Sequence, residues 1–564
     1  MNKKYGLILG ILAALSVNAT VLAASPLPQF EKEAIEDTYR RTGDMESKIE
    51  NKNDGLSKDH LGNTGTKANP AFYVKKIKIT GHPVEDQFGE LKKIIAGYER
   101  KSLDMKAMRQ LQADVTKFVR DRGYTVCQAV IPPQVVENGE LEVKIYVASY
   151  DKVTRVAPTE KEKTPKVAER VLDRYVGQIK PGEVIRDVRL EKTLNRLNDL
   201  PGVQAKAILQ PGSKAGTTSL DIAVERRPVW NNYVFVDNGG SKATGRYRYG
   251  FYTEINNPGE QGDKIGVSGM TSNGDLWGGS IKYETPVGYR GTRMGIALSL
   301  TDYDTDTSLF YSTKGRSVGA SYYGYTPIYR DKRSRVHAVW GYDHRRLKDK
   351  YTNDELKDAL KSIGLEPGDN KRHANVLHAG ITGSEYEKNR FTQYNAIWWY
   401  GNVTGDRNYF GGSVVDNEGS FHKGTADFTH IIFDGKTNYR VNFSGQVANH
   451  NLDSSERFYI GGMNSVRAYN GSAFSGDNGF YWCGEIRRNL GIEGLEAAIF
   501  IEGADAKFKG GQSRSLQGWG LGLRYRKDND WHLQLDYARK IRHETDIDEE
   551  TKSGRWWFQA YKMY

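Results

Sequence analysis

Two neighbouring stretches decide the fold: residues 518–525 read GWGLGLRY and residues 531–537 read WHLQLDY. In both, every second residue is apolar or aromatic, and the residues between them are glycine or polar. A period of two is typical of a β-strand with one apolar face. The same alternation occurs at residues 247–253 and 439–447. Segments of about ten residues, aromatic at the ends and apolar on one face only, are what a membrane β-barrel strand requires.

The alternation extends from Trp230 to the aromatic last residue, Tyr564. Candidate strands lie near residues 230, 245, 262, 275, 290, 315, 333, 372, 388, 421, 437, 478, 495, 515, 531 and 554. This even number returns the chain end to the side where the barrel began, and the strands must close into a ring because a bilayer supplies no backbone partners. The sequence therefore predicts a barrel of 16 antiparallel strands over residues 228–564. A soluble all-β domain with the same alternation is the alternative.

The composition supports a β-rich chain. With 27% charged residues and a mean hydropathy of −0.66, the 564 residues cannot form a conventional bundle of transmembrane helices. The counts of Gly 61, Tyr 34 and Trp 10 against Pro 16 fit β-structure. Basic residues exceed acidic ones by 81 − 70 = 11. They are spread along the chain rather than clustered, which argues against a nucleic-acid partner.

Three segments precede the first folded domain. Two lysines, an apolar run at residues 7–15 and then two small residues form the pattern of a secretory signal peptide over residues 1–24. The apolar run is too short to span a bilayer. Residues 25–52 are charged and helix-prone, and residues 53–70 are rich in Asn, Gly, Lys and Asp, as flexible linkers are. By length and polarity alone, this segment is more typical of a disordered leader than of a working helix.

Two successive units with the same order of elements follow. The first, residues 71–150, is expected to contain a strand at 74–79, helices near 91–95 and 108–118, and strands at 126–131 and 141–147. The second, residues 151–227, repeats this order with a strand at 153–156, helices at 167–175 and 190–197, and strands at 203–209 and 220–224. The helix near 108–118 rests on apolar residues three and four apart. Each unit is long enough for a small two-layer α/β domain.

Several short motifs together carry a family resemblance. They are Arg122-Gly123-Tyr124 with Val130-Ile131-Pro132-Pro133-Gln134; Leu200-Pro201-Gly202-Val203 with Leu209-Gln210-Pro211-Gly212; Asp237-Asn238-Gly239-Gly240 with Thr244-Gly245-Arg246, Asn257-Pro258 and Asp263; Val466-Arg467-Ala468-Tyr469; and Phe500-Ile501-Glu502-Gly503. In this combination the chain resembles the outer-membrane transporters of two-partner secretion. These are the haemolysin/adhesin secretion-activation family within the superfamily of POTRA-plus-barrel proteins.

The resemblance implies a domain plan and a location. Residues 25–52 would be an N-terminal plug helix, residues 71–150 POTRA 1, residues 151–227 POTRA 2, and residues 228–564 the outer-membrane barrel, with a long pore loop around residues 455–478. The POTRA domains would lie in the periplasm. The implied POTRA substrate-binding region is Tyr124, Pro132, Pro133 and Gln134. The implied first barrel hairpin includes Asp237, Asn238, Thr244 and Gly245.

The resemblance also implies an interaction inside the barrel. Val466, Arg467, Ala468 and Tyr469 resemble the VRGY/F motif at the tip of the family's pore loop, and Phe500, Glu502 and Gly503 resemble its FxDxG motif on a lumen-facing strand. The alternation along this strand independently predicts that Glu502 points inward, because the alternate positions Leu495, Ala497, Ile499 and Ile501 are apolar and would face lipid. We therefore expect Arg467 to dock on Glu502 through a bidentate pair. The chain departs from the family pattern at Ala468, Glu502 and Ala504, where the family has Gly, Asp and Gly.

Enzyme signatures are absent or out of context. The chain contains neither GxxxxGK[ST] nor HExxH. The GxSxG match at residues 315–319 is followed by a β-type pattern rather than by a helix, so it is not a nucleophile elbow. The acidic run Asp546, Asp548, Glu549 and Glu550 is interpreted as an exposed loop rather than as a cation site. We expect no enzyme, no cofactor and no metal, and we interpret Cys127 and Cys483 as incidental and unpaired.

The resemblance then implies a function. The POTRA domains would bind an unfolded exported partner by strand addition, and the barrel would translocate it to the cell surface without nucleotide. The partners would be a large secreted exoprotein and outer-membrane lipid, and the transporter would be a monomer or a weak dimer. The alternatives are an insertase of the same superfamily, a passive porin or receptor, and a soluble β-rich adhesin. The cargo is left open among haemolysin, adhesin and contact-dependent toxin.

Overall fold

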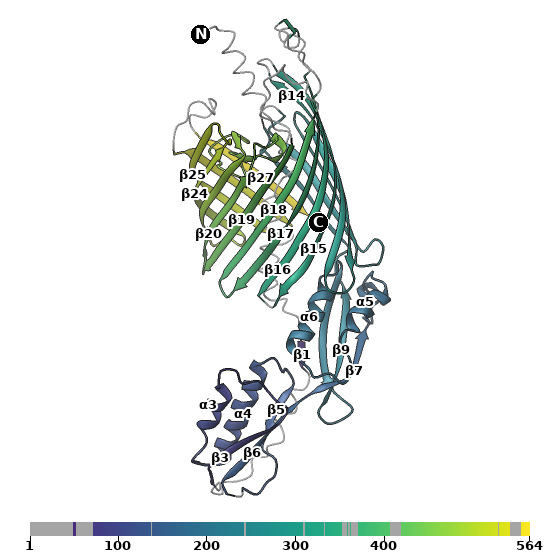
Figure 1. Ribbon diagram of the computed structural model, residues 1–564, viewed down its shortest axis with the longest axis vertical. Coiled ribbons are helices and arrows are strands. Elements are labelled where there is room, and N and C mark those ends of the chain that lie inside the picture. Colours follow the sequence, from purple (N-terminus) through teal and green to yellow (C-terminus); the bar gives the residue numbers. More distant parts are fainter. Residues whose placement is uncertain are drawn as a thin grey trace. The chain divides into compact units, whose positions relative to one another are not determined.

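The computed structural model describes residues 49–51, 71–136, 138–241, 244–307, 311–331, 333–351, 358, 361–362, 370–405, 419–527, 530–541 and 554–564 (Figure 1). The chain divides into two compact units, Met45–Arg227 and a second that contains Pro228–Tyr564. The expected signal peptide, the linker at residues 53–70 and residues 25–48 of the expected plug helix lie outside the described residues. So do Asp546, Asp548, Glu549 and Glu550.

The first α/β domain contains the expected elements and one additional strand pair. Its elements are β2 (Phe72–Val74), β3 (Lys76–Gly81), α3 (Glu90–Ala96), β4 (Lys101–Leu103), α4 (Met105–Asp121), β5 (Cys127–Val130) and β6 (Glu140–Val147). Strand β6 lies between β3, which is parallel to it, and β5, which is antiparallel. The pair β2–β4 forms a small separate sheet. Its strands have only three residues each, which is too short for an alternating pattern, so the sequence did not predict this pair.

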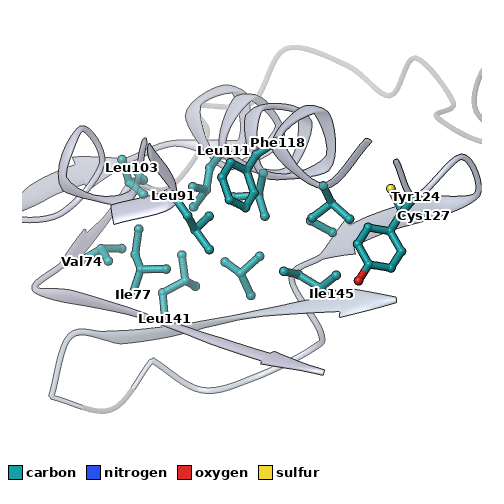
Figure 2. Packing of buried hydrophobic residues seen from close by; sticks show 14 residues of the cluster. Val74, Ile77, Leu91, Leu103, Leu111, Phe118, Tyr124, Cys127, Leu141 and Ile145 are labelled. Carbon is teal, nitrogen blue, oxygen red and sulfur yellow. The ribbon is translucent and has the colours of Figure 1, made fainter. Parts of the chain in front are cut away.

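Helix α4 forms the core of this domain because its apolar residues recur three and four apart. Leu111 and Phe118 point from α4 toward Leu141 and Ile145 of β6 (Figure 2). All four side chains are buried. Asp104 caps the start of the helix: its carboxylate accepts a hydrogen bond from the backbone N–H of Ala107 at 2.7 Å, which satisfies one of the donors that a helix leaves open there.

The second α/β domain repeats the order strand, helix, helix, strand, strand. Its elements are β7 (Ser149–Val156), the short helix η2 (Lys161–Lys163), α5 (Glu169–Val176), α6 (Asp187–Asn198), β8 (Val203–Pro211) and β9 (Thr217–Arg226). Every second residue of β8 from Val203 to Leu209 is buried, as are Leu190 and Leu194 of α6. The expected repeat is therefore present. Its first strand begins at Ser149, two residues before the expected boundary.

A short strand from the N-terminal region completes the second sheet. Strand β1 (Ile49–Asn51) lies parallel to β8, with Ile49 opposite Ala207, in a sheet of order β1-β8-β9-β7. The sequence analysis placed these residues in a helix over residues 25–52, and for residues 49–51 that prediction is wrong. The free edge of β8 offers backbone partners to an extended segment, whereas a helix with few apolar residues has no face to bury.

The second unit is a closed barrel of sixteen antiparallel strands, as predicted. The strands are β10 (Trp230–Asp237), β11 (Arg248–Asn256), β12 (Lys264–Ser272), β13 (Asp275–Val287), β14 (Thr292–Thr307), β15 (Tyr311–Arg330), β16 (Ser334–Tyr351), β17 (Asn370–Glu387), β18 (Arg390–Gly405), β19 (Gly419–Asp434), β20 (Thr437–Ala448), β23 (Asn478–Asn489), β24 (Leu495–Lys507), β25 (Ser513–Lys527), β26 (Trp531–Lys540) and β27 (Arg555–Met563). Strand β27 pairs with β10 and closes the ring.

The alternation that predicted the strands separates two faces of the wall. On β24, Ile499 and Ile501 are 52% and 48% exposed, whereas Phe500 and Glu502 between and beside them are buried. The parity prediction for Glu502 is therefore confirmed: the apolar residues form the outer face and the carboxylate points inward. Among the described residues, no helix is long and apolar enough to cross a membrane.

Candidate functional site

A long loop between β20 and β23 contacts the inner face of the barrel. Within it lie a short helix, η3 (Ser454–Glu456), and a hairpin of β21 (Phe458–Ile460) and β22 (Phe474–Gly476). Gly461 and Gly462 have φ angles of +91° and +101°, which only glycine adopts readily, and they turn the chain after β21. The loop tip then follows, with Val466, Ala468 and Tyr469 fully buried.

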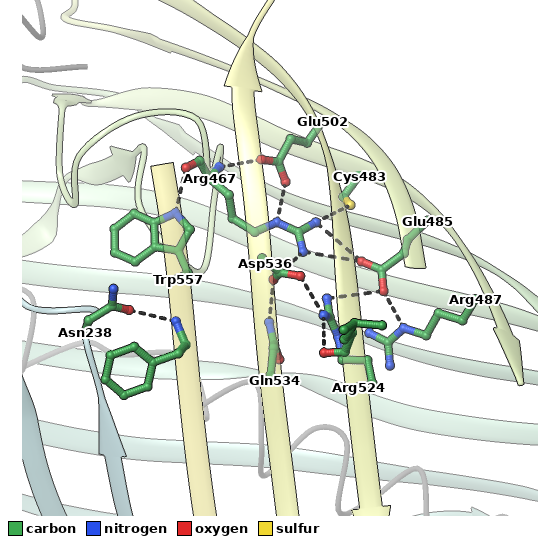
Figure 3. A network of polar contacts seen from close by, with 12 residues as sticks. Asn238, Arg467, Cys483, Glu485, Arg487, Glu502, Arg524, Gln534, Asp536 and Trp557 are labelled. Atoms are coloured by element: carbon green, nitrogen blue, oxygen red, sulfur yellow. Dashed lines mark hydrogen bonds and ion pairs between the residues drawn. The ribbon is translucent and has the colours of Figure 1, made fainter. Parts of the chain in front are cut away.

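The structure brings Arg467 of this tip together with Glu502 of β24 (Figure 3). The Nε of Arg467 donates to Glu502 Oε2 at 3.0 Å, and the backbone N–H of Arg467 donates to Glu502 Oε1. The expected partners are thus correct, but the expected geometry is wrong. The carboxylate binds one side-chain and one backbone donor, instead of two donors of the guanidinium group, so it fixes the backbone of the tip as well as its side chain.

The other donors of Arg467 reach residues that the sequence analysis missed. Nη1 donates to Asp536 at 3.0 Å, and Nη2 approaches Glu485 at 3.4 Å and the thiol of Cys483 at 3.4 Å. Cys483 is therefore part of the site, and our interpretation of it as incidental is wrong. The indole N–H of Trp557 donates to the carbonyl of Arg467 at 2.6 Å. The alternation of β26 places Asp536 on the inner face of the barrel, and this alternation was the signal in the sequence that could have identified it.

Two further arginines extend this cluster of buried charges. Arg524 Nη1 lies 2.6 Å from Asp536 Oδ1, and the guanidinium group of Arg487 contacts Glu485. We call these six residues the tip cluster: the arginines Arg467, Arg487 and Arg524 and the carboxylates Glu485, Glu502 and Asp536. All six side chains are buried. Each arginine of the cluster contacts one of its carboxylates, so removing one member would leave its partners uncompensated inside the barrel.

An aromatic ring supports the same arginine. The guanidinium carbon of Arg467 lies 3.3 Å from the centroid of the Phe500 ring, a cation–π contact. Phe500 belongs to β24 and points inward beside Glu502. The two motif residues of this strand therefore act on one group, the ring through its face and the carboxylate through hydrogen bonds.

The alanine that replaces the family's glycine in the loop motif is accommodated by a glycine on the wall. Ala468 is not among the residues with positive φ, so its backbone does not require glycine. Its Cβ packs against Gly518 of β25, where an added Cβ would lie only 2.8 Å away. Gly518 thus provides the space that Ala468 occupies.

The stem of the loop is attached to a different part of the wall. The carboxylate of Glu456 lies 2.8 Å from Nζ of Lys423 on β19 and also contacts the guanidinium group of Arg345 on β16. Asp453 contacts Arg372 on β17, which also lies 2.6 Å from Asp349. We call these contacts the stem cluster. None of its wall residues was singled out from the sequence.

The residues of the expected first hairpin organise the closing seam of the barrel. Asp237 accepts two hydrogen bonds from Arg248, at 2.7 and 3.0 Å. The side chain of Asn238 accepts from the backbone N–H of Phe558 at 2.8 Å and donates to the carbonyl of Trp556 at 2.9 Å. The register pairs between β10 and β27 end at Asp237, so Asn238 continues the seam with its side chain.

Thr244 and Gly245 form the far side of this hairpin. Thr244 is buried, and its carbonyl accepts a hydrogen bond from the hydroxyl of Ser272. Gly245 has a φ of +95°, and a Cβ there would lie 2.3 Å from the backbone nitrogen of Gly274. Glycine is therefore required at this position.

The expected substrate-binding residues of the first α/β domain lie at the two ends of β5. Tyr124 precedes the strand, is buried, and lies with its ring 5.0 Å from the guanidinium carbon of Arg186. Gln134 follows it and exchanges hydrogen bonds with the backbone of Glu142 at 2.8 and 2.9 Å, which extends the sheet by side-chain pairing. Pro132 and Pro133 lie in the intervening loop.

Cys127, the second cysteine, also lies in this domain. It is buried and free. Burial raises the pKa of its thiol, which keeps the group neutral and unreactive. The expectation that the two cysteines are unpaired agrees with the structure.

Comparisons with known proteins agree with this architecture. Residues 216–525 match the family described as haemolysin secretion/activation protein ShlB/FhaC/HecB, and residues 72–147 match the POTRA domain, ShlB-type. The heme/hemopexin transporter protein HuxB of Haemophilus influenzae is 25% identical over 486 residues, 83% of each chain. The outer membrane transporter CdiB of Dickeya dadantii (strain 3937) is 23% identical over 436 residues, 74% of this chain and 72% of that protein.

A solved structure shows the same fold. CdiB from Escherichia coli superimposes with a TM-score of 0.70 at 16% identity, over 95% of this chain and 97% of that chain. A closed sixteen-stranded barrel with an inward-docked loop and a POTRA domain defines an outer-membrane protein of the POTRA-plus-barrel class. Within that class, the chain belongs to the haemolysin secretion/activation family of ShlB, FhaC and HecB. The family consists of transporters of two-partner secretion, which lie in the outer membrane with their POTRA domains in the periplasm.

Proposed function

We propose that this chain captures a large exoprotein, unfolded in the periplasm, and passes it through the barrel lumen to the cell surface. The single observation that carries the proposal is the pore loop, whose tip is attached to the inner wall through Arg467 and the tip cluster. A polypeptide crossing the lumen requires this loop to move. An ion cluster is suited to that task, because water and cargo can solvate its charges once the tip leaves.

The direction of movement needs no nucleotide in this proposal. The inner wall carries charged residues, among them Arg440, Arg487 and Arg524, which are buried near Glu485. An unfolded chain can exchange contacts with such a polar wall without entering the lipid. Folding of the exoprotein outside the cell then biases the movement outward.

Capture is proposed to occur by strand addition at the edge of β8, where the cargo segment would take the place of β1. The chain's own β1 lies parallel to β8 at Ala207–Leu209, which supports the view that this edge accepts an extended segment. In strand addition, main-chain hydrogen bonds supply affinity and tolerate many sequences. Tyr124, Pro132, Pro133 and Gln134, at the ends of β5 in the other α/β domain, remain a proposed substrate-binding region of their own.

The N-terminal segment is proposed to act as a resting plug. Residues 25–48 would form the helix, and residues 53–70 the linker that allows it to leave the lumen. The oligomeric state is proposed to be a monomer or a weak dimer, with outer-membrane lipid around the barrel. Cross-linking the plug segment to the inner wall in intact cells would test it, because a fixed plug should stop secretion.

Replacing Arg467 tests the proposed role of the pore loop. We expect Arg467→Ala to reduce secretion of the exoprotein while the folded barrel remains in the outer membrane, because the tip loses all three carboxylate partners. Arg488→Ala is the matched control, since Arg488 is an exposed residue of β23 outside the tip cluster. Secretion and the heat-modifiable folded barrel are measured together, along with total outer-membrane proteins. Unchanged secretion by Arg467→Ala would contradict the proposal, and a general loss of outer-membrane proteins would favour an insertase.

A further inference from the structure

A basic groove lies where the two α/β domains meet. It has a volume of about 590 Å³ and is lined by residues just past α4 and α5 and by one face of α6 with the residue before it. The groove contains five basic residues and one exposed valine: Arg122, Arg186, Arg189, Lys192, Arg196 and Val188. Its nine lining residues include five cations and no carboxylate.

The junction that forms the groove is fixed by hydrogen bonds. The backbone N–H of Asp187, at the start of α6, donates to the carbonyl of Gly123, just past α4, at 2.9 Å. Ala148, between the domains, donates to Val126 at 2.9 Å and accepts from Ile185 at 3.0 Å. The groove is therefore a defined concavity within one compact unit.

Its charges are only partly neutralised by neighbouring carboxylates. Arg122 pairs with Glu90 at 3.1 Å, and Arg189 pairs with Glu183 at 2.9 Å. Arg186 contacts the Tyr124 ring but no carboxylate among the described residues, and Lys192 contacts none there either. Arg186 and Lys192 are both exposed, so the groove presents positive charge to the periplasm.

The spacing of these cations favours an elongated ligand. Residues 186, 189, 192 and 196 follow one face of α6, and ten residues of helix span about 15 Å. An extended peptide covers that length with about five residues. A single phosphate would contact only one or two of the cations. Val188, 74% exposed, adds an apolar contact between them.

We propose that this groove binds an extended acidic segment of the exoprotein. The inference rests on the proposed transport function and adds a selective element to it. Strand addition at β8 recognises the backbone of any extended chain, whereas complementary charge discriminates between sequences and speeds encounter. Cargo segments rich in Asp and Glu with interspersed apolar residues are therefore retained at the junction.

Peptide binding to the full-length protein in detergent tests the proposal. The probe is a fluorescein-labelled peptide of about ten residues that repeats Glu-Val, and the comparison peptide repeats Lys-Val. We expect Arg186→Glu with Lys192→Glu to weaken binding of the Glu-Val peptide by at least about tenfold, and Arg186→Gln with Lys192→Gln to weaken it less. The matched control is Lys152→Glu with Lys161→Glu, exposed positions outside the groove, which should bind as the natural protein does.

Three outcomes would overturn the inference: equal binding by the charge-reversed groove variant, equal binding of the Lys-Val peptide, or displacement of the Glu-Val peptide by micromolar inorganic phosphate. The last outcome would indicate a site for a single anion. Circular dichroism of each variant confirms that the domains are folded. The Arg467→Ala secretion assay does not involve the groove, so failure of the transport proposal and failure of this inference are separate results.

Discussion

Arg467 carries its charge into a site where it is only 3% exposed, and it contacts three carboxylates there. Transferring an unpaired guanidinium group to such a site would cost several kcal/mol, whereas removing one partner of a buried pair typically costs about 3–5 kcal/mol. The docked state of the tip therefore depends on each carboxylate. Among them, Glu502 holds both the side chain and the backbone of Arg467.

Glu502→Gln should release the loop tip. The amide keeps one acceptor but loses the charge, so Arg467 and the backbone N–H are no longer both satisfied. Ser465→Cys, in a background with Cys127→Ala and Cys483→Ser, reports the change, because Ser465 is 8% exposed when the tip is docked. We expect thiol labelling of residue 465 in isolated outer membranes to become at least about tenfold faster.

The control for this experiment is Glu496→Gln. Glu496 lies on the same strand and the same face but contacts Asn438 rather than Arg467, so labelling should stay slow. Fast labelling of the control, or slow labelling of Glu502→Gln, would contradict a specific role for Glu502 in holding the tip.

Gly518→Ala should disturb the tip by overpacking. An added Cβ would lie 2.8 Å from the Cβ of Ala468, and overpacking of this kind costs about 1–3 kcal/mol. We expect faster labelling at residue 465 and restoration of slow labelling when Ala468→Gly is combined with it. Gly424→Ala is the control, since a Cβ at Gly424 meets nothing within 4 Å. Failure of the second substitution to restore docking would show that the two residues do not share this space.

The sequence predicts part of this site and not the rest, for a geometric reason. Motif and strand parity together indicate Arg467 and Glu502. Parity also turns Asp536 and Glu485 inward, but their height in the barrel depends on the stagger between strands, which a list of alternating residues does not contain. Trp557 binds a carbonyl of the loop, and no side-chain pattern identifies such a partner.

Among the elements, long alternating segments were predicted well and short strands were not. All sixteen barrel strands arise from a period of two repeated over eight or more residues. Strand β1 has three residues, which contain no measurable period. It forms because the edge of β8 is available to it, a tertiary effect that local sequence cannot report.

Ile49→Pro should open the edge of β8. Proline fixes φ near about −65°, away from the extended φ of a strand, and a strand of three residues has few other backbone bonds to hold it, so β1 should detach. We expect faster hydrogen exchange at Ala207–Leu209, which β1 covers in the natural protein. Ile49→Val is the matched control and should leave exchange unchanged. If Ile49→Pro also leaves it unchanged, β1 does not protect this edge in solution.

At the scale of the whole molecule, the seam between β10 and β27 is where two mechanisms differ. Transport of the cargo through the lumen leaves this seam closed, whereas lateral release of a protein into the membrane requires it to open. Strands β10 and β27 share five register pairs, from Tyr233 opposite Met563 to Asp237 opposite Gln559. Neighbouring pairs such as β25–β26 share ten. The seam is thus the shortest route by which the wall could open, and Asn238 extends it by its side chain.

A disulfide across the seam tests whether the wall opens. Asn238→Cys with Phe558→Cys places two thiols at the next register position, where the side chain of Asn238 already meets the backbone of Phe558. We expect secretion to continue after oxidation, because cargo passes through the lumen of a closed barrel. Each single cysteine variant is the control. Secretion that stops on oxidation and returns with a reductant would favour an insertase-like lateral opening.

The two attachment points of the pore loop have a consequence for the permeability barrier of the cell. The tip cluster and the stem cluster attach the loop to different strands of the wall. A fluctuation that breaks one attachment therefore leaves the other intact. If detachment of the tip and detachment of the stem are independent, spontaneous leakage of small solutes scales with the product of the probabilities of these two detachments, each of which is small. A cargo chain that engages both regions in turn can nevertheless pass, and a wide conduit stays compatible with an envelope that excludes antibiotics and detergents.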